Sequence, residues 1–495
     1  MRGSVRCVRY SYRQEIVMHA QVSKLLYLTI GENKGAPRLF IESDRLRAAG
    51  LDVGARYTPV YDADAKRVNL IVSDEGDRIV CRRKRADGDV PLIDINNQQL
   101  GMFGTGARVV VAIRADGIEI ELHHHTQREV ERVERLLQEL AAGQVSTGEV
   151  CAGGGVMAEA LHVGLARAGV SSKMRFAVEM EPDYVGSLNK RCAAVTADTL
   201  LVQGSMQEID LSRLPKVSVL ASGIPCTGAS LSGRAKNKLS RPEDHATAGH
   251  LFVHFLRIVE AVNPTVCLLE NVPSYANTVS FAVITSCLRE WGYTVEHRVL
   301  DRSLGAFEDR QRLVMVATTK GVDVRFEDLV PAATAPKTLG ELLEDIPADD
   351  PRFKRYDYLK AKEVRDIEAG KGFRQQIVGP DATSCGTIGR GYAKVRSTEI
   401  RVACPGDPNK SRLLTPAEHA RVKGAPERLV AGLCDTTAHE ILGQGVLFPM
   451  FVAVGRMIGN GIQRLRSAPK ILPPQLPPVD LSPRAALGQL SLFAA

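Results

Sequence analysis

Three short polar clusters, about forty residues apart, could form a single reactive site. The first is Gly223-Ile-Pro-Cys226, which carries a thiol, and the second is Glu270-Asn-Val272, which carries a carboxyl group. The third is Arg310-Gln-Arg312, which carries two guanidinium groups. A thiol nucleophile, an acid and a cation together suit covalent attack on a base.

The first two clusters each follow a short apolar run that predicts a strand. These runs are residues 217–220, before the thiol cluster, and residues 266–269, before the carboxyl cluster. In open α/β sheets, ligands bind at the carboxyl ends of the strands. We therefore expect an α/β fold in which these groups gather at one edge of a sheet.

A glycine-rich turn at residues 151–155 lies between a predicted strand that begins near Gly148 and a predicted helix that reaches Ala168. The next predicted strand ends at Glu179. Glycines let a cofactor approach the backbone, and an acid at the end of the second strand can accept ribose hydroxyls. The turn is shorter than the phosphate-binding fingerprint, which favours a cofactor without phosphates.

These clusters belong to a series in fixed order, which ends with two further blocks at 412–426 and 443–449. From about residue 148 to 465, the series resembles the DNA (cytosine-5)-methyltransferases. The resemblance implies a Rossmann-like methyltransferase domain that uses S-adenosyl-L-methionine and acts on cytosine in DNA. Two alternatives stay open: a tRNA cytosine-5 methyltransferase, and a catalytically weak methylase-like regulator that binds DNA.

The resemblance also implies residue roles. Cys226 matches the nucleophile that adds to C6 of cytosine, and Glu270 matches the acid that must hold a proton at N3. Arg312 matches the residue that holds the base O2, with support from Arg310. The base must leave the stack to reach these groups, so base flipping is expected. The implied donor-binding residues are Cys151, Ala152, Gly153, Gly155, Glu179, Ser205, Pro225 and Gln444.

The chain departs from the family pattern at several positions outside the nucleophile and the acid. The replacements are Cys151 for an aromatic residue, Thr227 for Gln, Ser205 for Asp, Glu308 for Gln and Gln444 for Asn. We therefore expect an active enzyme, and the replacements leave adenine recognition and donor preference open.

Two basic segments are candidates for phosphate contact. The formal charge of the chain is +7, and residues 351–412 alone hold 14 Lys plus Arg against 7 Asp plus Glu. This excess suits a surface that faces phosphate, although a solvated surface is the alternative. A second basic loop follows Cys226. The expected DNA contacts are Arg234, Lys236, Arg241, Lys371, Arg374, Arg390, Lys394 and Arg396.

Residues 18–125 contain a β-rich pattern that occurs twice: a strand, a short polar turn, a glycine and a hairpin, beginning at Pro37 and at Pro91. The pattern resembles the swapped-hairpin barrels of AbrB- and SymE-like proteins. Arg82-Arg-Lys-Arg85 between the halves suits phosphate contact, and a dimerisation or docking module is the equal alternative. We expect no metal site at His123-His-His125, because consecutive side chains point in different directions.

The expected organisation has seven segments. Residues 1–17 form a possible extension, with Met18 as an alternative start, and a linker helix at 126–145 follows the β-rich module. The remaining segments are the catalytic core 146–330, the target-recognition region 331–410, the C-terminal part of the core 411–466 and the Pro-rich, flexible tail 467–495.

The tail ends in a motif that resembles the pentapeptide by which bacterial proteins bind the replication sliding clamp. Its residues are Gln489, Leu490, Leu492 and Phe493. Docking of Phe493 on its own domain is the alternative.

Ten cysteines without a CxxC pair argue against a disulfide framework or a zinc ribbon, and indicate a reducing compartment. No apolar run approaches the roughly 20 residues that a membrane span needs. The first 17 residues lack the apolar core of a secretory signal. We expect a cytoplasmic, nucleoid-associated protein. The sequence reveals neither the target site nor whether a restriction endonuclease partner exists.

Overall fold

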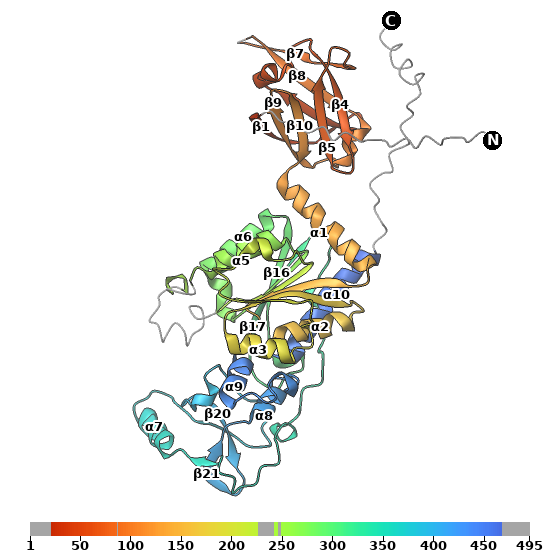
Figure 1. Ribbon diagram of the computed structural model, residues 1–495. Helices are drawn as coiled ribbons and strands as arrows, with labels where there is room; N and C mark the ends of the chain where they lie inside the picture. The colour runs from red at the N-terminus through yellow and green to blue at the C-terminus, as the bar shows by residue number, and fades with distance from the viewer. Residues whose placement is uncertain (1–20, 87, 226–241, 246–248, 468–495) are drawn as a thin grey trace, which may run out of the picture. The chain divides into compact units, whose positions relative to one another are not determined.

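The computed structural model describes residues 21–86, 88–225, 242–245 and 249–467. The described residues form two compact units, which are divided between Gln127 and Arg128 (Figure 1). Possible extension 1–17 and tail 467–495, apart from Ser467, lie outside the described residues.

The first unit consists of two antiparallel sheets. One has the order β1-β9-β10-β5-β4-β6 and the other has the order β2-β3-β8-β7. Side chains alternate along β3: Leu39 and Ile41 point into the core, whereas Arg38 and Phe40 are partly exposed. The strands are β1 (Val22–Thr29), β2 (Gly31–Asn33), β3 (Ala36–Glu42), β4 (Arg56–Asp62), β5 (Arg67–Val72), β6 (Arg78–Ile79), β7 (Cys81–Arg85), β8 (Gly88–Asn96), β9 (Arg108–Arg114) and β10 (Gly117–Leu122).

The expected order of elements is present twice in this unit. Strand β3, the turn η1 (Asp44–Ala49) and hairpin β4–β5 match strand β8, the turn η2 (Gln98–Met102) and hairpin β9–β10. Ser43 and Asn97 cap the two turns with their side chains. The glycines that precede the hairpins, Gly54 and Gly106, both have positive φ, where an L side chain would be strained. The likeness to a swapped-hairpin barrel remains a prediction.

The three adjacent histidines do not diverge as expected. Their ring nitrogens lie within 4.8 Å of one another, because α1 (His124–Ala141) begins directly after the hairpin and brings the three rings together. His123 Nδ1 already accepts the amide of His125, at 3.2 Å. The basic strand β7 is exposed throughout, but Glu42 lies 3.3 Å from Arg83 and 2.6 Å from Arg85.

The second unit is built on a sheet with the order β13-β12-β11-β14-β15-β17-β16 (Figure 1). The chain moves outward from β11 through β12 to β13 and then returns to β14, so the topological switch lies between β11 and β14. Strand β17 is antiparallel to both of its neighbours. The Rossmann-like fold expected from the sequence is confirmed. The strands are β11 (Val145–Val150), β12 (Ser172–Glu179), β13 (Leu200–Gln203), β14 (Val219–Gly223), β15 (Val266–Asn271), β16 (Tyr293–Leu300) and β17 (Arg312–Thr319).

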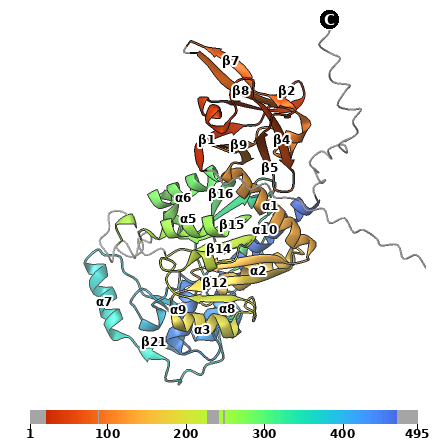
Figure 2. The ribbon, with the colours of Figure 1, turned by 45° about the horizontal axis from the view of Figure 1, so that its top comes forward.

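Helices cover both faces of this sheet (Figures 1 and 2). On β15, Leu268 packs with one set of helices and Leu269 packs with the other, because successive strand residues face opposite ways. The first set includes α2 (Val156–Arg167), α3 (Pro182–Arg191), α9 (Asp435–Gln444) and α10 (Phe448–Ser467); the second includes α5 (Leu251–Val262) and α6 (Val279–Glu290).

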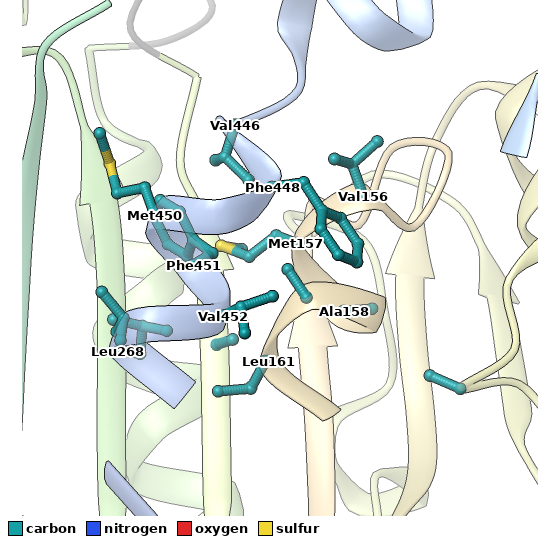
Figure 3. Packing of buried hydrophobic residues seen from close by; sticks show 14 of the residues in the cluster. Val156, Met157, Ala158, Leu161, Leu268, Val446, Phe448, Met450, Phe451 and Val452 are labelled. Atoms are coloured by element: carbon teal, nitrogen blue, oxygen red, sulfur yellow. The ribbon is translucent and has the colours of Figure 1, made fainter. Parts of the chain in front are cut away.

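Helices α2 and α10 lie side by side over the sheet, with Leu161, Phe451 and Val452 in the shared core (Figure 3). Their backbones approach closely because Gly164 has no side chain. A Cβ atom at this position would lie 2.3 Å from the Val452 carbonyl oxygen.

The expected linker helix is part of the second unit from Arg128 onward. Arg132 on α1 is 1% exposed, and it donates to Asn263 Oδ1 at 2.7 Å and to the Trp291 carbonyl at 2.9 Å. Helix α1 is therefore anchored on the second unit. The predicted end of the linker helix, residue 145, lies after this anchor.

The segment after β17 has a small sheet with the order β18-β21-β20-β19 and its own core around Ile388, Tyr392 and Ile400. The sheet extends to Arg412, two residues beyond the expected segment 331–410. Its strands are β18 (Lys354–Arg355), β19 (Gln376–Val378), β20 (Ile400–Cys404) and β21 (Asp407–Arg412), with helix α7 (Asp357–Glu368) and the following helix α8 (Pro416–Val422).

Among the described helices, no single one is long and apolar enough to cross a membrane. By length and composition alone, the pair formed by α9 and α10, bent by 44°, passes that test, but most of α10 is buried in the core.

Candidate active site

The register of the sheet brings the predicted turns together. Val150, the last residue of β11, pairs with Ser222 on β14, and Gly223 pairs with Glu270 on β15. The glycine-rich turn, the turn that leads to Cys226 and the Glu270 carboxyl group therefore follow neighbouring strands at one edge. This is the edge beside the topological switch, where ligands bind in such folds.

Glu270 and Arg312 form an ion pair at this edge. Strand β17 runs antiparallel to β15, so it begins where β15 ends, and Arg312 is its first residue. Arg312 Nε lies 2.6 Å from Glu270 Oε1, and their side chains are only 11% and 13% exposed. The structure thus brings together the acid and one of the two expected cations.

Cys226 lies outside the described residues, as do Arg234, Lys236 and Arg241. The approach to Cys226 is described. The side-chain amide of Asn271 donates through Nδ2 to the Ile224 carbonyl at 3.2 Å. A Cβ atom at Gly223 would be 3.3 Å from Glu270 Oε2. Pro225, the last described residue before the gap, is exposed. The chain therefore leaves β14 beside the acid.

The Glu179 side chain forms hydrogen bonds with the backbone of the glycine-rich turn and of the residues after β12. Its carboxylate accepts the backbone amides of Gly153 at 2.7 Å, Met180 at 2.8 Å and Glu181 at 3.0 Å. Gly153 has φ +55° and open space where a side chain would be. Gly155 also has a positive φ, +86°, and a Cβ atom there would in addition come within 3 Å of Leu188 and Cys192.

Comparison with known proteins agrees with this geometry. The model of the C-5 cytosine-specific DNA methylase family matches residues 146–460. The chain belongs to this family. Type II methyltransferase M.NlaX from Neisseria lactamica is 30% identical over 266 residues, which are 52% of this chain and 80% of that protein. Type II methyltransferase M1.ScrFI from Lactococcus lactis subsp. cremoris is 28% identical over 260 residues, 51% of this chain and 64% of that protein.

The structure of the S. pombe Dnmt2 methyltransferase supports the fold assignment. It is 18% identical, has a TM-score of 0.50, and covers 65% of this chain and 99% of its own. The predicted activity is confirmed at the level of the family: a DNA cytosine-5 methyltransferase that uses S-adenosyl-L-methionine as the methyl donor.

Glu149 is a residue of the site that the sequence analysis missed. It is 1% exposed on β11, and neither carboxyl oxygen has a hydrogen-bond partner among the described residues. Burial, and then the nearby Glu179, raise the pKa of Glu149 well above its usual range, which favours the protonated form of this carboxyl group. The sequence offered one signal for Glu149, an acid two residues before the glycine-rich turn. The structure shows that the strand on which it lies is fully buried.

The residues at this edge fit the methyl donor of the family. A buried carboxyl group without a partner lies near the turn, and open space lies above Gly153. Cys151 has φ +58°, and burial raises the pKa of its thiol to about 12, so the thiol stays protonated. Ala152 is buried in the same turn.

Two replaced positions, Ser205 and Gln444, have local partners. The Gly204 amide donates to the Glu179 carbonyl at 3.0 Å, which places the turn with Ser205 beside the end of β12. Ser205 Oγ donates to Gln207 Oε1 at 3.3 Å. Gln444 is exposed at the end of α9, and its Nε2 donates to the Glu440 carbonyl at 3.3 Å.

Arg310, expected to support Arg312, lies in a buried cluster. It is 4% exposed, and donates to the Gly443 carbonyl at 2.9 Å and the Ile388 carbonyl at 3.1 Å. Burial, and then the neighbouring Arg312, lower the pKa of Arg310. Arg310 therefore joins the start of β17 to two other segments of the unit.

The expected DNA-binding residues in the described part of the chain are all exposed: Lys371, Arg374, Arg390, Lys394 and Arg396. Arg390 is 50% exposed and also lies 3.6 Å from Glu181 and 3.7 Å from Glu440, beside the Tyr184 ring.

Proposed function

We propose that this enzyme methylates cytosine in double-stranded DNA through covalent attack by Cys226 on a flipped base. The observation that carries the proposal is the Glu270–Arg312 pair, at 2.6 Å, beside the turn that leads to Cys226. An acid paired with a guanidinium group, at the end of the strand next to a thiol-bearing turn, can bind one edge of a cytosine while the thiol attacks its ring.

The residues act in a fixed order in this proposal. The Cys226 thiolate forms a bond to C6 of cytosine, and Glu270 donates a proton to N3, so that negative charge does not build up on the ring. Arg312 holds the base O2. S-adenosyl-L-methionine supplies a methyl group for C5, and Cys151, Ala152, Gly153, Gly155, Glu179, Ser205, Pro225 and Gln444 are the residues that would hold it. After methylation, the C5 proton passes to solvent water, the bond between C6 and Cys226 breaks to restore the thiolate, and the N3 proton returns to Glu270.

We further propose that residues 331–410 read the target sequence and that the exposed Lys371, Arg374, Arg390, Lys394 and Arg396 contact phosphates. Arg234, Lys236 and Arg241 would close over the DNA on the loop after Cys226. The support is the excess of Lys plus Arg in residues 351–412, 14 against 7 Asp plus Glu, and the separate core of the segment. Nucleoid association follows from DNA binding. Whether a restriction endonuclease accompanies the enzyme is left open.

The test compares substrates and one variant. Wild-type protein is incubated with S-adenosyl-L-methionine that carries a labelled methyl group, and with mixed-sequence DNA or bulk tRNA. We expect label in DNA, at C5 of cytosine, and none with Cys226→Ala. DNA that contains 5-fluorocytosine should trap the wild type covalently, because no C5 proton can leave. Label in tRNA alone, or retained turnover in Cys226→Ala, would contradict the proposal.

We also propose that the C-terminal tail binds the replication sliding clamp. The support is the sequence motif Gln489, Leu490, Leu492 and Phe493 at the end of a Pro-rich segment. A tethered peptide would raise the local concentration of the enzyme at replicating DNA. The test measures clamp binding by the full chain and by Leu492→Ala/Phe493→Ala. Equal binding by both proteins, or none by either, would reject the clamp assignment.

A further inference from the structure

A buried group of charges, Glu308, Arg310 and Lys423, lies near the Glu270–Arg312 pair. Glu308 and Lys423 are both 0% exposed, and Arg310 is 4% exposed. Glu308 Oε2 lies 2.8 Å from Lys423 Nζ, whereas Oε1 lies 3.3 Å from Arg310 Nη1 and accepts the Ile388 amide at 3.0 Å. The Glu308 carboxylate therefore forms ion pairs with two cations and accepts a hydrogen bond from one backbone amide.

The carboxylate in this cluster is ionised. Burial opposes ionisation, but Lys423 and Arg310 outweigh it and hold the pKa of Glu308 below its usual range. A buried ion pair contributes little net stability compared with apolar side chains of similar volume. Stability alone therefore does not account for the cluster, and its connections are the more informative feature.

The cluster connects the start of β17 to the segment proposed to recognise the target. Three consecutive residues, 308–310, are all bonded to residues 385–388. The Asp309 amide donates to the Cys385 carbonyl at 2.8 Å, and Thr387 Oγ1 donates to the Asp309 carbonyl at 2.7 Å. Arg310 and Glu308 supply the two bonds to Ile388. Arg312 follows two residues later.

The same cluster reaches the donor side of the site. Arg310 Nη2 donates to the Gly443 carbonyl at 2.9 Å, directly before Gln444. Only Glu308 among these residues contacts Arg310, Lys423 and Ile388 together. Loss of its charge would leave Arg310 with the carbonyls of Ile388 and Gly443 and no carboxylate partner, so Arg310 and the backbone that carries Arg312 would be held less firmly.

We propose that Glu308 is a positioning residue for Arg312. By holding Arg310 and the Ile388 amide at the same time, it fixes the backbone from which Arg312 reaches Glu270, and it ties that backbone to residues 385–388. The inference rests on the proposed function, in which Arg312 holds the base. Glu308 is 0% exposed, so it contacts neither DNA nor the donor.

The experiment uses the full chain and three variants. Glu308→Gln keeps the shape of the side chain and loses the charge. Glu308→Asp keeps the charge but is too short to reach Arg310 and Ile388 together, and it serves if Glu308→Gln does not fold. Lys423→Met is the matched control, because it removes the same buried ion pair and leaves the contacts of Glu308 with Arg310 and Ile388 intact.

For each folded protein, kcat, the KM values for DNA and donor, and the rate of covalent trapping on 5-fluorocytosine DNA are measured. We expect kcat and the trapping rate of the Glu308 variants to fall by about tenfold or more, as for a misplaced catalytic group. Both KM values should change little, and Lys423→Met should stay within about threefold of wild type in kcat.

Two results would overturn the inference: a folded Glu308 variant with wild-type kcat, or an equal loss of kcat in Lys423→Met. The first would show that Arg312 does not depend on Glu308, and the second would show that the cluster only supports folding. An inactive wild type would instead contradict the proposed function, so the two failures are distinguishable.

Discussion

At the scale of single residues, the site depends on the pairing of Glu270 with Arg312. The two side chains are nearly buried and lie 2.6 Å apart, so each orients the other before a base arrives. This arrangement fixes the direction in which the Glu270 carboxyl group meets the base.

Glu270→Gln should slow methyl transfer by about 10²-fold or more, the usual effect of losing a positioned acid. The amide keeps the shape of the side chain and can still accept a hydrogen bond from Arg312, so the affinity for S-adenosyl-L-methionine should stay nearly unchanged. Single-turnover methylation and calorimetric titration with the donor measure the two quantities. An unchanged methylation rate would show that Glu270 only ends the strand.

At the scale of elements, the catalytic edge depends on helices that pack closely behind it. Helix α2 begins at the glycine-rich turn and lies against α10 where Gly164 faces the Val452 carbonyl. Lys423 directly follows helix α8, and its side chain contacts Glu308 in the buried charge cluster.

Gly164→Ala should lower the free energy of unfolding by about 1–3 kcal/mol, because the new methyl group meets backbone atoms that cannot move aside. The matched variant is Gly186→Ala on α3. A Cβ atom there has nothing within 4 Å, so better helix propensity should raise stability by up to about 1 kcal/mol. Denaturant unfolding of both variants tests the pair; effects of the same sign would contradict the packing argument.

Lys423 should make stability depend on pH in the alkaline range. Burial, and then Arg310, lower the pKa of Lys423 from 10.5 to about 7. Below pH 7 both folded and unfolded states hold the proton, and the full cost of burying the charge is present. Between pH 7 and 10.5 the unfolded state binds more protons, so the free energy of unfolding rises with pH.

Lys423→Met removes this titration and leaves the other groups in place. Denaturant unfolding at several values between pH 7 and 9 should show wild type gaining stability relative to the variant as pH rises. Parallel pH dependences for the two proteins would show that Lys423 does not titrate in this range.

At the scale of the whole molecule, the described residues of the catalytic site all belong to the second unit. Glu149, Glu179, Glu270 and Arg312 lie after Arg128, where this unit begins. The first unit supplies a double-sheet module, in which Arg83 and Arg85 of the basic strand β7 share Glu42 as an ion-pair partner.

Deletion of residues 1–122 should therefore leave methylation of DNA, measured with labelled donor, although DNA affinity or oligomeric state is expected to change. Deletion of residues 1–145 is the contrasting variant. It also removes α1, and with it the buried Arg132 that binds Asn263 and the Trp291 carbonyl, so its melting temperature should be lower. A folded but inactive 1–122 deletion would show that the first unit completes the site.

The sequence by itself determined the local features of this protein. The apolar runs before Gly223 and Glu270, and the glycines after Val150, predicted strand ends that the structure shows at one edge. Local patterns are readable because the conformations of strands and turns depend on neighbouring residues. The order of these blocks was also enough to indicate the family.

Only the tertiary structure decided which side chains meet. Arg312 reaches Glu270 because β17 is antiparallel between β15 and β16, which its own residues do not reveal. Glu308 and Lys423 are more than a hundred residues apart in sequence, yet they form a pair with no exposure to solvent. Such contacts depend on how distant segments pack. For the same reason, the sequence did not reveal that Arg390 lies near Glu181 and Glu440 or that Arg310 is buried.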